Sequence, residues 1–429
     1  MLVLYASADR YLRSGGRLGM VVTQTLFQTR GAGDGFRRFR LGHEGSLLKV
    51  LRVDDLVDIQ PFDTASNWTA TICLEKGVPT SYPVPYVRWS CPANGQADRD
   101  SSMPGRMVSQ RLEAFPVDPE HPQTPWFVRP EGLDIDINGL TGPSEYTGHL
   151  GANSGGANGV YWLNMLGRDG EAIEVENLVK RGKQALPSVR TQVEPDLLYP
   201  LVRWSDVGRY QAKPSACLLL AQDPTTRRGI DETLFRQAYP KTYAYLRRFE
   251  SQLRGRAAYR RYQESAPFYS MYNVGEYTVA PYKVVWRRMD HRVRAAVLEP
   301  CEVPLLGRRP SICQETCVMI AAESGDEAHY LAALLNSSIV GFLVQSHSVR
   351  GGKGFGSPGM LEYVGIRRFD AENPEHRELA CLSRAAHQAA VIGADLRAIE
   401  ESIDEKAGLL YQITRAEARW LTRFLRSGT

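Results

Sequence analysis

The sequence contains few cysteines and no long apolar run. Its seven cysteines are scattered over 429 residues, a pattern that excludes a disulfide-stabilised secreted scaffold and favours a reducing, cytoplasmic setting. Cys313 and Cys317 form the only close pair, and without a second pair or a histidine at zinc spacing we expect two buried thiols and no metal site. No segment approaches the ~20 apolar residues that span a bilayer, and the N-terminal residues lack the features of a signal peptide.

Strong compositional bias is absent as well. The chain is 43% hydrophobic and 23% charged, which is ordinary for a globular protein of two or three domains. Its formal net charge of +4 is too small to name a partner. None of the eight histidines stands with Ser, Cys or Asp in a catalytic pattern. The functional signal therefore has to come from local patterns.

Residues 1–85 have the pattern of an α/β domain. The expected elements are a helix over 2–12, a buried strand over 17–27, a short helix over 36–41, and two further strands over 47–59 and 70–76. This order is typical of the second half of a doubly wound sheet.

The rest of the chain divides into three regions. Residues 86–148 hold eight prolines and show little periodicity, which indicates an irregular linker or insertion. Residues 149–370 return to a mixed α/β pattern, and residues 371–429 are expected to form a C-terminal helical region. Within the second of these regions, residues 201–300 carry 18 Lys or Arg against 9 Asp or Glu, together with half of the 20 tyrosines.

Two glycine-rich segments stand in residues 149–370. The first, "GANSGGANG" at 151–159, has backbone amides that could hold a DNA phosphate, or it is only the turn that starts the domain. The second, "SVRGGKGFG" at 348–356, carries Arg350 and Lys353 on a loop that could reach a DNA groove, with a hinge as the alternative. The sequence leaves both pairs of interpretations open.

The order of these patterns resembles a known family, the adenine-N6 DNA methyltransferases of Type I, Type IIG and Taq-like restriction-modification systems. The segments that follow one another as in that family are "LRSGGRLGMVVTQTLF", "LLKVLRVDDLVDIQPFDTASNWTATICLEKG", "GANSGGANGVYWL", "LYPLVRWSDVGRY", "YPKTYAYLRRFESQLRGR", "APYKVVWRR" and "YLAALLNSSIVGFL". The resemblance covers nearly the whole chain. It implies the C-terminal part of a Rossmann-like methyltransferase sheet in residues 1–85, followed by a mixed α/β target-recognition domain in 149–370 and C-terminal helices.

The resemblance gives Phe62 a role. Methylation of an adenine amine requires the base to leave the stack, and an aromatic ring can replace part of the lost stacking, worth ~1–3 kcal/mol per base. In the family an aromatic at the head of the last hairpin does this, and Phe62 in "QPFDTASNW" is at the matching place, with Asp63, Ser66 and Asn67 as a polar lip. The alternative from the residues alone is a Phe that caps the core beside an ordinary hairpin loop.

Two signatures of the family are absent from the chain. Neither the aromatic-x-Gly-x-Gly turn that holds S-adenosylmethionine nor the Asn/Asp-Pro-Pro-Tyr/Phe catalytic motif occurs, and Thr23 stands where many relatives have a proline. "RGAGDG" follows an expected strand but comes too late in the fold for the cofactor loop. The resemblance implies S-adenosylmethionine as cofactor, yet no residue here is assigned to it. We therefore expect this chain to be inactive alone and to work with an N-terminal methyltransferase half or subunit.

Residues suited to recognition of a DNA sequence are better represented in this chain than residues suited to catalysis. Lys and Arg contribute phosphate contacts that supply affinity, while base-edge contacts supply specificity. The predicted DNA-binding residues are Asn153, Ser154, Gly155, Gly156, Arg247, Arg248, Arg287, Arg288, Arg350 and Lys353. Further phosphate candidates, unless this stretch is only a solvated helix face, are Arg254, Arg256, Arg260 and Arg261. Lys283 is as suited to pairing within the domain as to reaching a DNA groove. Asp206 is expected to pair with Arg203 or Arg209.

These patterns lead to one predicted function and two alternatives. The chain is predicted to be the C-terminal portion or subunit of a site-specific DNA adenine-N6 methyltransferase of a restriction-modification or phage-defence system, with double-stranded DNA as partner. The first alternative is a stand-alone DNA-binding specificity module. The second is a scaffold protein without DNA binding. A neighbouring open frame that encodes the two missing signatures would favour the methyltransferase.

Overall fold

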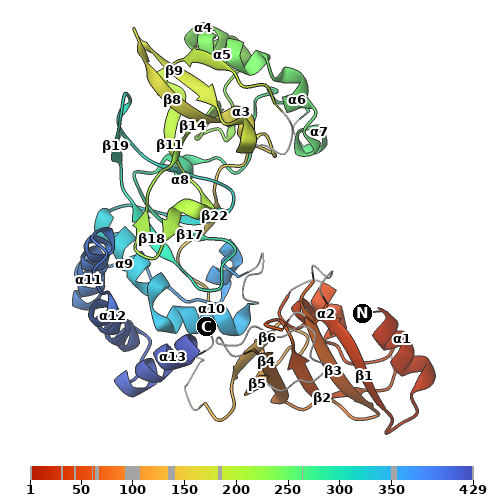
Figure 1. Ribbon diagram of the computed structural model, residues 1–429. Coiled ribbons are helices and arrows are strands. Elements are labelled where there is room, and N and C mark those ends of the chain that lie inside the picture. Colours follow the sequence, from red (N-terminus) through yellow and green to blue (C-terminus); the bar gives the residue numbers. More distant parts are fainter. Residues whose placement is uncertain are drawn as a thin grey trace. The chain divides into compact units, whose positions relative to one another are not determined.

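The computed structural model describes residues 2–29, 32–42, 45–59, 61–62, 67–91, 107–133, 141–181, 186–262, 264–348 and 355–427. The chain forms two compact units (Figure 1). The N-terminal unit comprises Met1–Asp136 with Gln345–Val349 and Arg426–Thr429, and the C-terminal unit comprises Ile137–Val344 and Arg350–Leu425. The division near residue 136 falls inside the expected 86–148 region, and not at either of its ends.

The N-terminal unit is built on one six-stranded sheet with the strand order β1-β3-β2-β4-β5-β6. Strands β2 and β4 are parallel, and the other neighbours in this sheet are antiparallel. The elements of this unit include α1 (Leu2–Tyr11), β1 (Arg17–Thr23), the 3₁₀ turn η1 (Gln24–Phe27), α2 (Ala32–Phe36), β2 (Leu48–Asp55), β3 (Thr69–Lys76), β4 (Val84–Ser90), β5 (Val108–Pro116) and β6 (Trp126–Pro130). The segment between Asp55 and Thr69 therefore joins two antiparallel neighbours, β2 and β3.

Strand β1 lies at the edge of this sheet, whereas the sequence pattern predicted a buried strand. Of its seven residues only Val22 is buried, and Val21 on the opposite face is 53% exposed. The apolar run looked continuous because the chain leaves the strand at Thr23 and turns through η1, which buries Phe27 completely. The buried part of the run is thus the turn, and not the strand.

Residues 84–130 contain strands where the sequence pattern predicted an irregular linker. β4, β5 and β6 extend the sheet, and Trp126 at the start of β6 is fully buried. Pro116 and Pro130 are the last residues of their strands, and three more prolines stand in the connection between β5 and β6. Proline is tolerated at such places because its missing N–H takes no part in a central ladder. The described part of this region is therefore regular sheet, and not the irregular linker or insertion that the sequence pattern predicted.

Aromatic rings fill the core of the N-terminal unit. Phe27 stacks on Trp126 with ring centroids 5.0 Å apart, and Phe36 meets Phe27 edge-on at 5.8 Å. Arg37 is buried beside them and forms an ion pair of 2.6 Å with Asp34. This packing fixes α2 and the residues after it against one face of the sheet.

The C-terminal unit contains two larger sheets and several short hairpins. One sheet has the order β10-β9-β8-β14-β11-β21, and the other has the order β18-β17-β22-β7. Strand β17 is central in the second sheet, which explains why its four middle residues are all buried. The strands of this unit include β7 (His149–Leu150), β8 (Trp162–Asp169), β9 (Ala172–Asn177), β10 (Arg190–Val193), β11 (Leu198–Val202), β12 (Val207–Gly208), β13 (Gln211–Ala212), β14 (Ala216–Leu219), β15 (Gln222–Asp223), β16 (Arg228–Gly229), β17 (Tyr282–Arg287), β18 (Ala295–Leu298), β19 (Cys301–Val303), β20 (Gly307–Arg309), β21 (Ile312–Cys313) and β22 (Cys317–Ala322).

Helices pack against both sheets of the C-terminal unit. Ten of the twelve residues of α9 are buried, and Ser324 caps this helix by accepting a hydrogen bond of 3.1 Å from the Glu327 amide. Figure 1 shows α11 and α12 lying alongside α9, in the same compact unit as the sheets. The helices are α3 (Asn158–Tyr161), α4 (Glu232–Ala238), α5 (Pro240–Arg247), α6 (Glu250–Arg254), α7 (Ala257–Tyr262), α8 (Glu276–Val279), α9 (Gly325–Asn336), α10 (Ser338–His347), α11 (Pro374–Val391), α12 (Arg397–Leu410) and α13 (Arg415–Ser427).

The structure confirms the mixed α/β class and the buried state of the close cysteine pair. Cys313 and Cys317 are both fully buried. Within the described residues, no group of three or more His, Cys, Asp or Glu side chains is placed to hold a metal ion. No single described helix is long and apolar enough to cross a membrane; α9 and α10 meet that test only as a pair, and they are bent by 59° at their junction.

Candidate nucleic-acid interface

The first glycine-rich segment forms a turn that is tied into the C-terminal unit. The backbone of Asn153 exchanges two hydrogen bonds of 2.9 Å with Tyr272, and the Asn153 side chain accepts one of 2.8 Å from the Gly155 amide. Gly155 and Gly156 have φ angles of +67° and +92°, which only glycine adopts readily. Ser154 is buried and its hydroxyl is 2.5 Å from Asn158 Oδ1. The turn interpretation accounts for these contacts, and the Gly155 amide is already used within the turn.

Arg256 holds this turn and is not a surface residue. Its side chain is 4% exposed and donates to the carbonyl oxygens of Ser154 at 2.8 Å and Phe268 at 2.7 Å. A Cβ on Gly155 would lie 3.3 Å from the Arg256 Cδ, so the glycine also makes room for the arginine. The prediction that Arg256 is available to a phosphate is wrong, because burial and backbone carbonyls consume its donors.

Helices α5 to α7 carry the exposed part of the basic stretch. Arg247 and Arg254 both pair with Glu250, at 3.2 Å and 2.8 Å. The side chains of Arg248, Arg260 and Arg261 are exposed, and none of the three has an ion-pair partner among the described residues. Figure 1 shows α4, α5, α6 and α7 following one another along the part of the unit formed by β8, β9 and β14. Exposed cations therefore lie directly after α5 and on α7.

Arg287, at the end of β17, is held inside the fold. Its Nε donates to the Val207 carbonyl at 2.6 Å, and its guanidinium lies 4.2 Å from the centre of the Trp204 ring. Asp290 is 3.7 Å from its Nη1, and only 14% of the side chain is exposed. Arg287 therefore positions Trp204, which is 38% exposed, more than it presents a free charge.

Arg288 and Gly356, the last residue of the second glycine-rich segment, meet at the end of β17. The Gly356 amide donates to the Arg288 carbonyl at 3.0 Å, and Trp286 Nε1 donates to the Gly356 carbonyl at 2.8 Å. A Cβ on Gly356 would lie 2.3 Å from the Arg287 carbonyl oxygen, so this position requires glycine. Arg288 Nε is buried and has no hydrogen-bond partner within the described part of the chain. Arg350 and Lys353 lie outside the described residues.

The local pairing predicted for Asp206 is confirmed. Asp206 Oδ2 is 3.2 Å from Arg203 Nε, and Ser215 donates its hydroxyl to the same carboxylate. Burial alone would raise the pKa of Asp206, but hydrogen bonds from Ser215 and Arg203 bring that pKa below its ordinary value. Lys283 also stays within the unit: it is fully buried, donates to the Ala280 carbonyl, and burial lowers its pKa to about 8.

Phe62 lies in the connection between β2 and β3 of the N-terminal unit, and its side chain is 50% exposed. The alternative interpretation required Phe62 to cap the core, and this exposure argues against it. Asp63 and Ser66 lie outside the described residues. Asn67 is described and exposed, just before β3 begins.

A buried polar network lies where this connection leaves β2. The sequence analysis did not predict it. Asp55, the last residue of β2, is 1% exposed; its carboxylate accepts from the Val57 amide at 3.1 Å and from the Tyr86 hydroxyl at 2.8 Å. Gln24 donates to the same hydroxyl at 3.1 Å. Burial raises the pKa of Asp55, although Arg88 at 3.7 Å opposes this shift. The signal available in the sequence was the paired carboxylates of "RVDDL" at the end of an apolar run.

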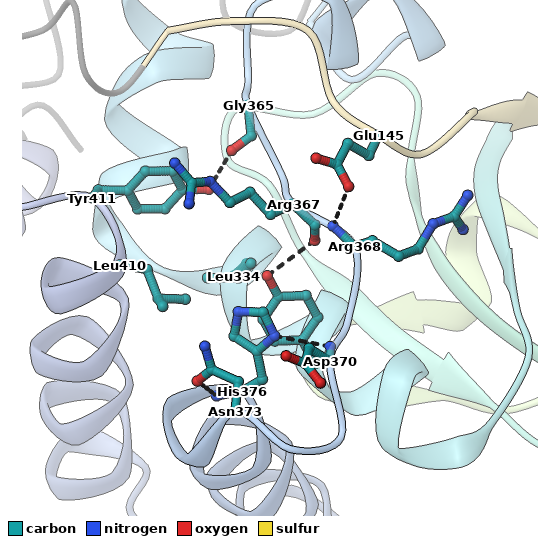
Figure 2. Close-up of a pocket in the computed structure, with 11 residues that line it drawn as sticks. Glu145, Leu334, Gly365, Arg367, Arg368, Asp370, Asn373, His376, Leu410 and Tyr411 are labelled. Atoms are coloured by element: carbon teal, nitrogen blue, oxygen red, sulfur yellow. Dashed lines mark hydrogen bonds between the residues drawn. The ribbon is translucent and has the colours of Figure 1, made fainter.

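A cavity of about 360 Å³ opens in the C-terminal unit, and it also went unnoticed in the sequence analysis (Figure 2). It lies between the start of α11, the segment that precedes this helix, and the end of α12. Its lining residues are Glu145, Tyr330, Leu334, Gly365, Arg367, Arg368, Asp370, Asn373, His376, Leu410 and Tyr411. The helix start is visible in the sequence as "ENPEH", but the other walls come from distant segments.

Comparison with known proteins finds likeness in structure and none in sequence. No family model and no curated protein matches the chain. Of the solved structures, the Type IIL restriction-modification enzyme MmeI in complex with DNA is similar with a TM-score of 0.55 and 10% identity, over 99% of this chain and 51% of that one. The type IIG restriction endonuclease BpuSI aligns with a TM-score of 0.32 and 12% identity, over 93% of this chain and 47% of that one. This chain is thus similar in fold to MmeI, and it spans about half the length of that enzyme.

Proposed function

We propose that this chain supplies target recognition and part of the flipped-base pocket to a site-specific DNA adenine-N6 methyltransferase of a restriction-modification system. The observation that carries the proposal is Phe62, an aromatic side chain that is half exposed at the head of the β2–β3 hairpin. Support for the setting comes from the order of the sequence motifs and from a fold that follows a restriction-modification enzyme over 99% of this chain. We also propose a cytoplasmic location, where its DNA partner is found.

In the proposed reaction Phe62 stacks on the adenine that has left the duplex. An extruded base loses its stacking neighbours, and an exposed ring recovers part of that free energy, ~1–3 kcal/mol. Asp55 supports this role as a positioning residue, because its carboxylate holds the Val57 amide at the beginning of the connection that carries Phe62. The buried network with Tyr86 gives that connection a rigid base.

DNA affinity in this proposal comes from the C-terminal unit. The exposed cations at α5 to α7, which can contact DNA phosphates, are Arg248, Arg260 and Arg261. Arg288, a half-buried residue at the end of β17, is the candidate for a closer contact. Arg247, Asn153 and Gly156 remain predictions of the sequence analysis.

Binding of the methyl donor and of the adenine amine is assigned to residues outside this chain. Residues 32–35 of "RGAGDG" lie in α2, and Asp34 pairs with Arg37, so this part is a helix and does not fit an S-adenosylmethionine loop. The chain also carries no Asn-Pro-Pro-Tyr motif. We propose that an N-terminal methyltransferase half or subunit supplies both, and we assign no cofactor-binding residue here.

A titration with duplex DNA separates this proposal from the scaffold alternative. The isolated chain should bind weakly, and log K should fall with log salt by ~0.9 for each phosphate that is neutralised. Fluorescence anisotropy at several salt concentrations measures both quantities. Absence of binding at low salt would favour the scaffold. A stand-alone specificity module would bind DNA equally well but would gain no methylation activity when the proposed N-terminal half is co-expressed.

A further inference from the structure

The cavity at the start of α11 has no role in the function proposed above. Its volume of about 360 Å³ falls in the ~300–1,000 Å³ range of small-molecule sites. All of its walls belong to the C-terminal unit, so its shape does not depend on the N-terminal unit.

One wall of the cavity presents hydrogen-bond donors from the first turn of α11. His376 is 5% exposed, and its Nδ1 accepts from the Asp370 amide at 3.0 Å. The neutral ring must then carry its proton on Nε2, and Figure 2 shows this nitrogen turned toward the cavity. Burial lowers the pKa of His376, which keeps the ring neutral at physiological pH. A buried donor thus faces an open space without a protein partner in the described ranges.

Asn373 adds a second donor to this wall. Its Oδ1 caps α11 by accepting from the Glu375 amide at 2.9 Å and the His376 amide at 3.2 Å. The capping bonds occupy the oxygen, so the NH₂ group is left for the cavity, as Figure 2 shows. The 18-residue helix also contributes the positive end of its dipole at this point.

The opposite wall includes the guanidinium of Arg367. Arg367 extends along it toward Tyr411, and this side chain has no ion-pair partner among the described residues. Two carboxylates also line the cavity, and each accepts a hydrogen bond from the backbone: Glu145 from the Arg368 amide at 2.8 Å, and Asp370 from the Glu372 amide at 2.9 Å. Figure 2 shows Arg367 on the side of the cavity away from His376 and Asn373.

The remaining surface is aromatic and apolar. The Tyr330 hydroxyl donates to the Arg367 carbonyl and the Tyr411 hydroxyl donates to the Gly365 carbonyl, both at 3.1 Å, so both rings are fixed. Leu334 and Leu410 complete this side. A ligand that fills the cavity needs an apolar or planar body as well as an acceptor-rich group.

We propose that this cavity binds a small organic phosphate of mononucleotide size. The phosphoryl oxygens accept from Arg367, from Asn373 Nδ2 and from His376 Nε2, at the N-terminus of α11. The organic body lies against Tyr411 and the two leucines. This site is separate from the exposed arginines of α5–α7, and it does not depend on the proposed methyltransferase role.

Calorimetry on the whole chain tests the proposal with four probes: adenosine 5′-monophosphate, adenosine, inorganic phosphate and benzoate. The monophosphate should bind at least ~10-fold more tightly than each of the other three, because only it offers both the phosphoryl group and the planar body. Equal binding of inorganic phosphate would overturn the organic part of the proposal. Equal binding of benzoate would overturn the choice of phosphate over carboxylate, and no binding of any probe would overturn the site.

Variants separate the cavity from the basic surface. Arg367→Met should weaken the monophosphate at least ~10-fold through loss of a charged hydrogen bond, whereas Arg377→Met, an exposed arginine on α11 outside the lining, should leave affinity unchanged. His376→Gln retains a donor near the Nε2 position and should keep most of the affinity that His376→Phe loses. Thermal melts check folding of each variant. Unchanged affinity in Arg367→Met, or equal losses in both arginine variants, would contradict the proposal.

Discussion

The end of β17 and helices α5 to α7 are both rich in arginine, yet they use it differently. Arg287, at the strand end, donates to a backbone carbonyl, lies on the Trp204 ring and is 14% exposed. On the helices, Arg248 and Arg260 stand in solvent and have no ion-pair partner among the described residues. Arginine is structural in one place and exposed to solvent in the other. The excess of Lys and Arg in the sequence is therefore larger than the positive charge that is accessible to a DNA phosphate.

The largest effect is expected where an arginine is structural. Arg256→Ala should lower the free energy of unfolding by about 3 kcal/mol or more, because the Ser154 and Phe268 carbonyls lose a buried donor at ~1–3 kcal/mol each. Urea unfolding measures the change. The matched control is Arg260→Ala, an exposed position four residues later, which should stay within ~0.5 kcal/mol of the parent. Equal stability of the two variants would show that the comparison between buried and exposed arginines is mistaken.

A pH-dependent loss of stability is expected from the core of the C-terminal unit. Burial, with smaller contributions from His387 and Arg384, lowers the pKa of His329 from 6.5 to about 3. Between these two values the unfolded chain binds a proton that the folded chain does not, so stability decreases as pH falls from 6.5 toward 3. His329→Gln should flatten that part of the profile, measured by urea unfolding at several pH values. The exposed His291→Gln serves as control, and a profile that stays equally steep in His329→Gln would refute the assignment.

A smaller effect is expected on DNA binding from the exposed cations of the helices. Replacing Arg248, Arg260 and Arg261 together by Ala should reduce the salt slope by ~0.9 for each phosphate that is no longer neutralised, and it should leave the melting temperature unchanged. Anisotropy titrations with duplex DNA measure the slope. The control replaces three exposed arginines of the C-terminal helices, Arg377, Arg397 and Arg419. If both triple variants change the slope equally, α5 to α7 are not the binding surface.

Local patterns were predictable from the sequence, and long-range contacts were not. The pairing of Asp206 with Arg203 lies within three residues, and the positive φ angles of Gly155 and Gly156 follow from a glycine-rich turn. Arg256 looked like its neighbours because its acceptor on Ser154 is 102 residues away. No local rule distinguishes a helical arginine that meets such a carbonyl from one that meets water.

The N-terminal sheet and the cavity illustrate the same limit. Prolines at the ends of β5 and β6 suggested a linker, since only the pairing with neighbouring strands identifies them as strand ends. The cavity joins His376 and Arg367 to Tyr330 and Tyr411, which stand on separate helices or at their ends. Its polar groups are ordinary in sequence, and their convergence appears only in the fold.

Co-expression with the proposed N-terminal methyltransferase half tests the central proposal most directly. The partner is a polypeptide that carries the cofactor and Asn-Pro-Pro-Tyr signatures and is encoded next to this chain, and adenine methylation of host DNA would identify the target. On that target Phe62→Ala should lower the methylation rate by the loss of ~1–3 kcal/mol of stacking, whereas Phe62→Trp should retain most of it. Because Phe62 is 50% exposed, both variants should keep the parent melting temperature. A stable Phe62→Ala variant that methylates at the parent rate would contradict the account.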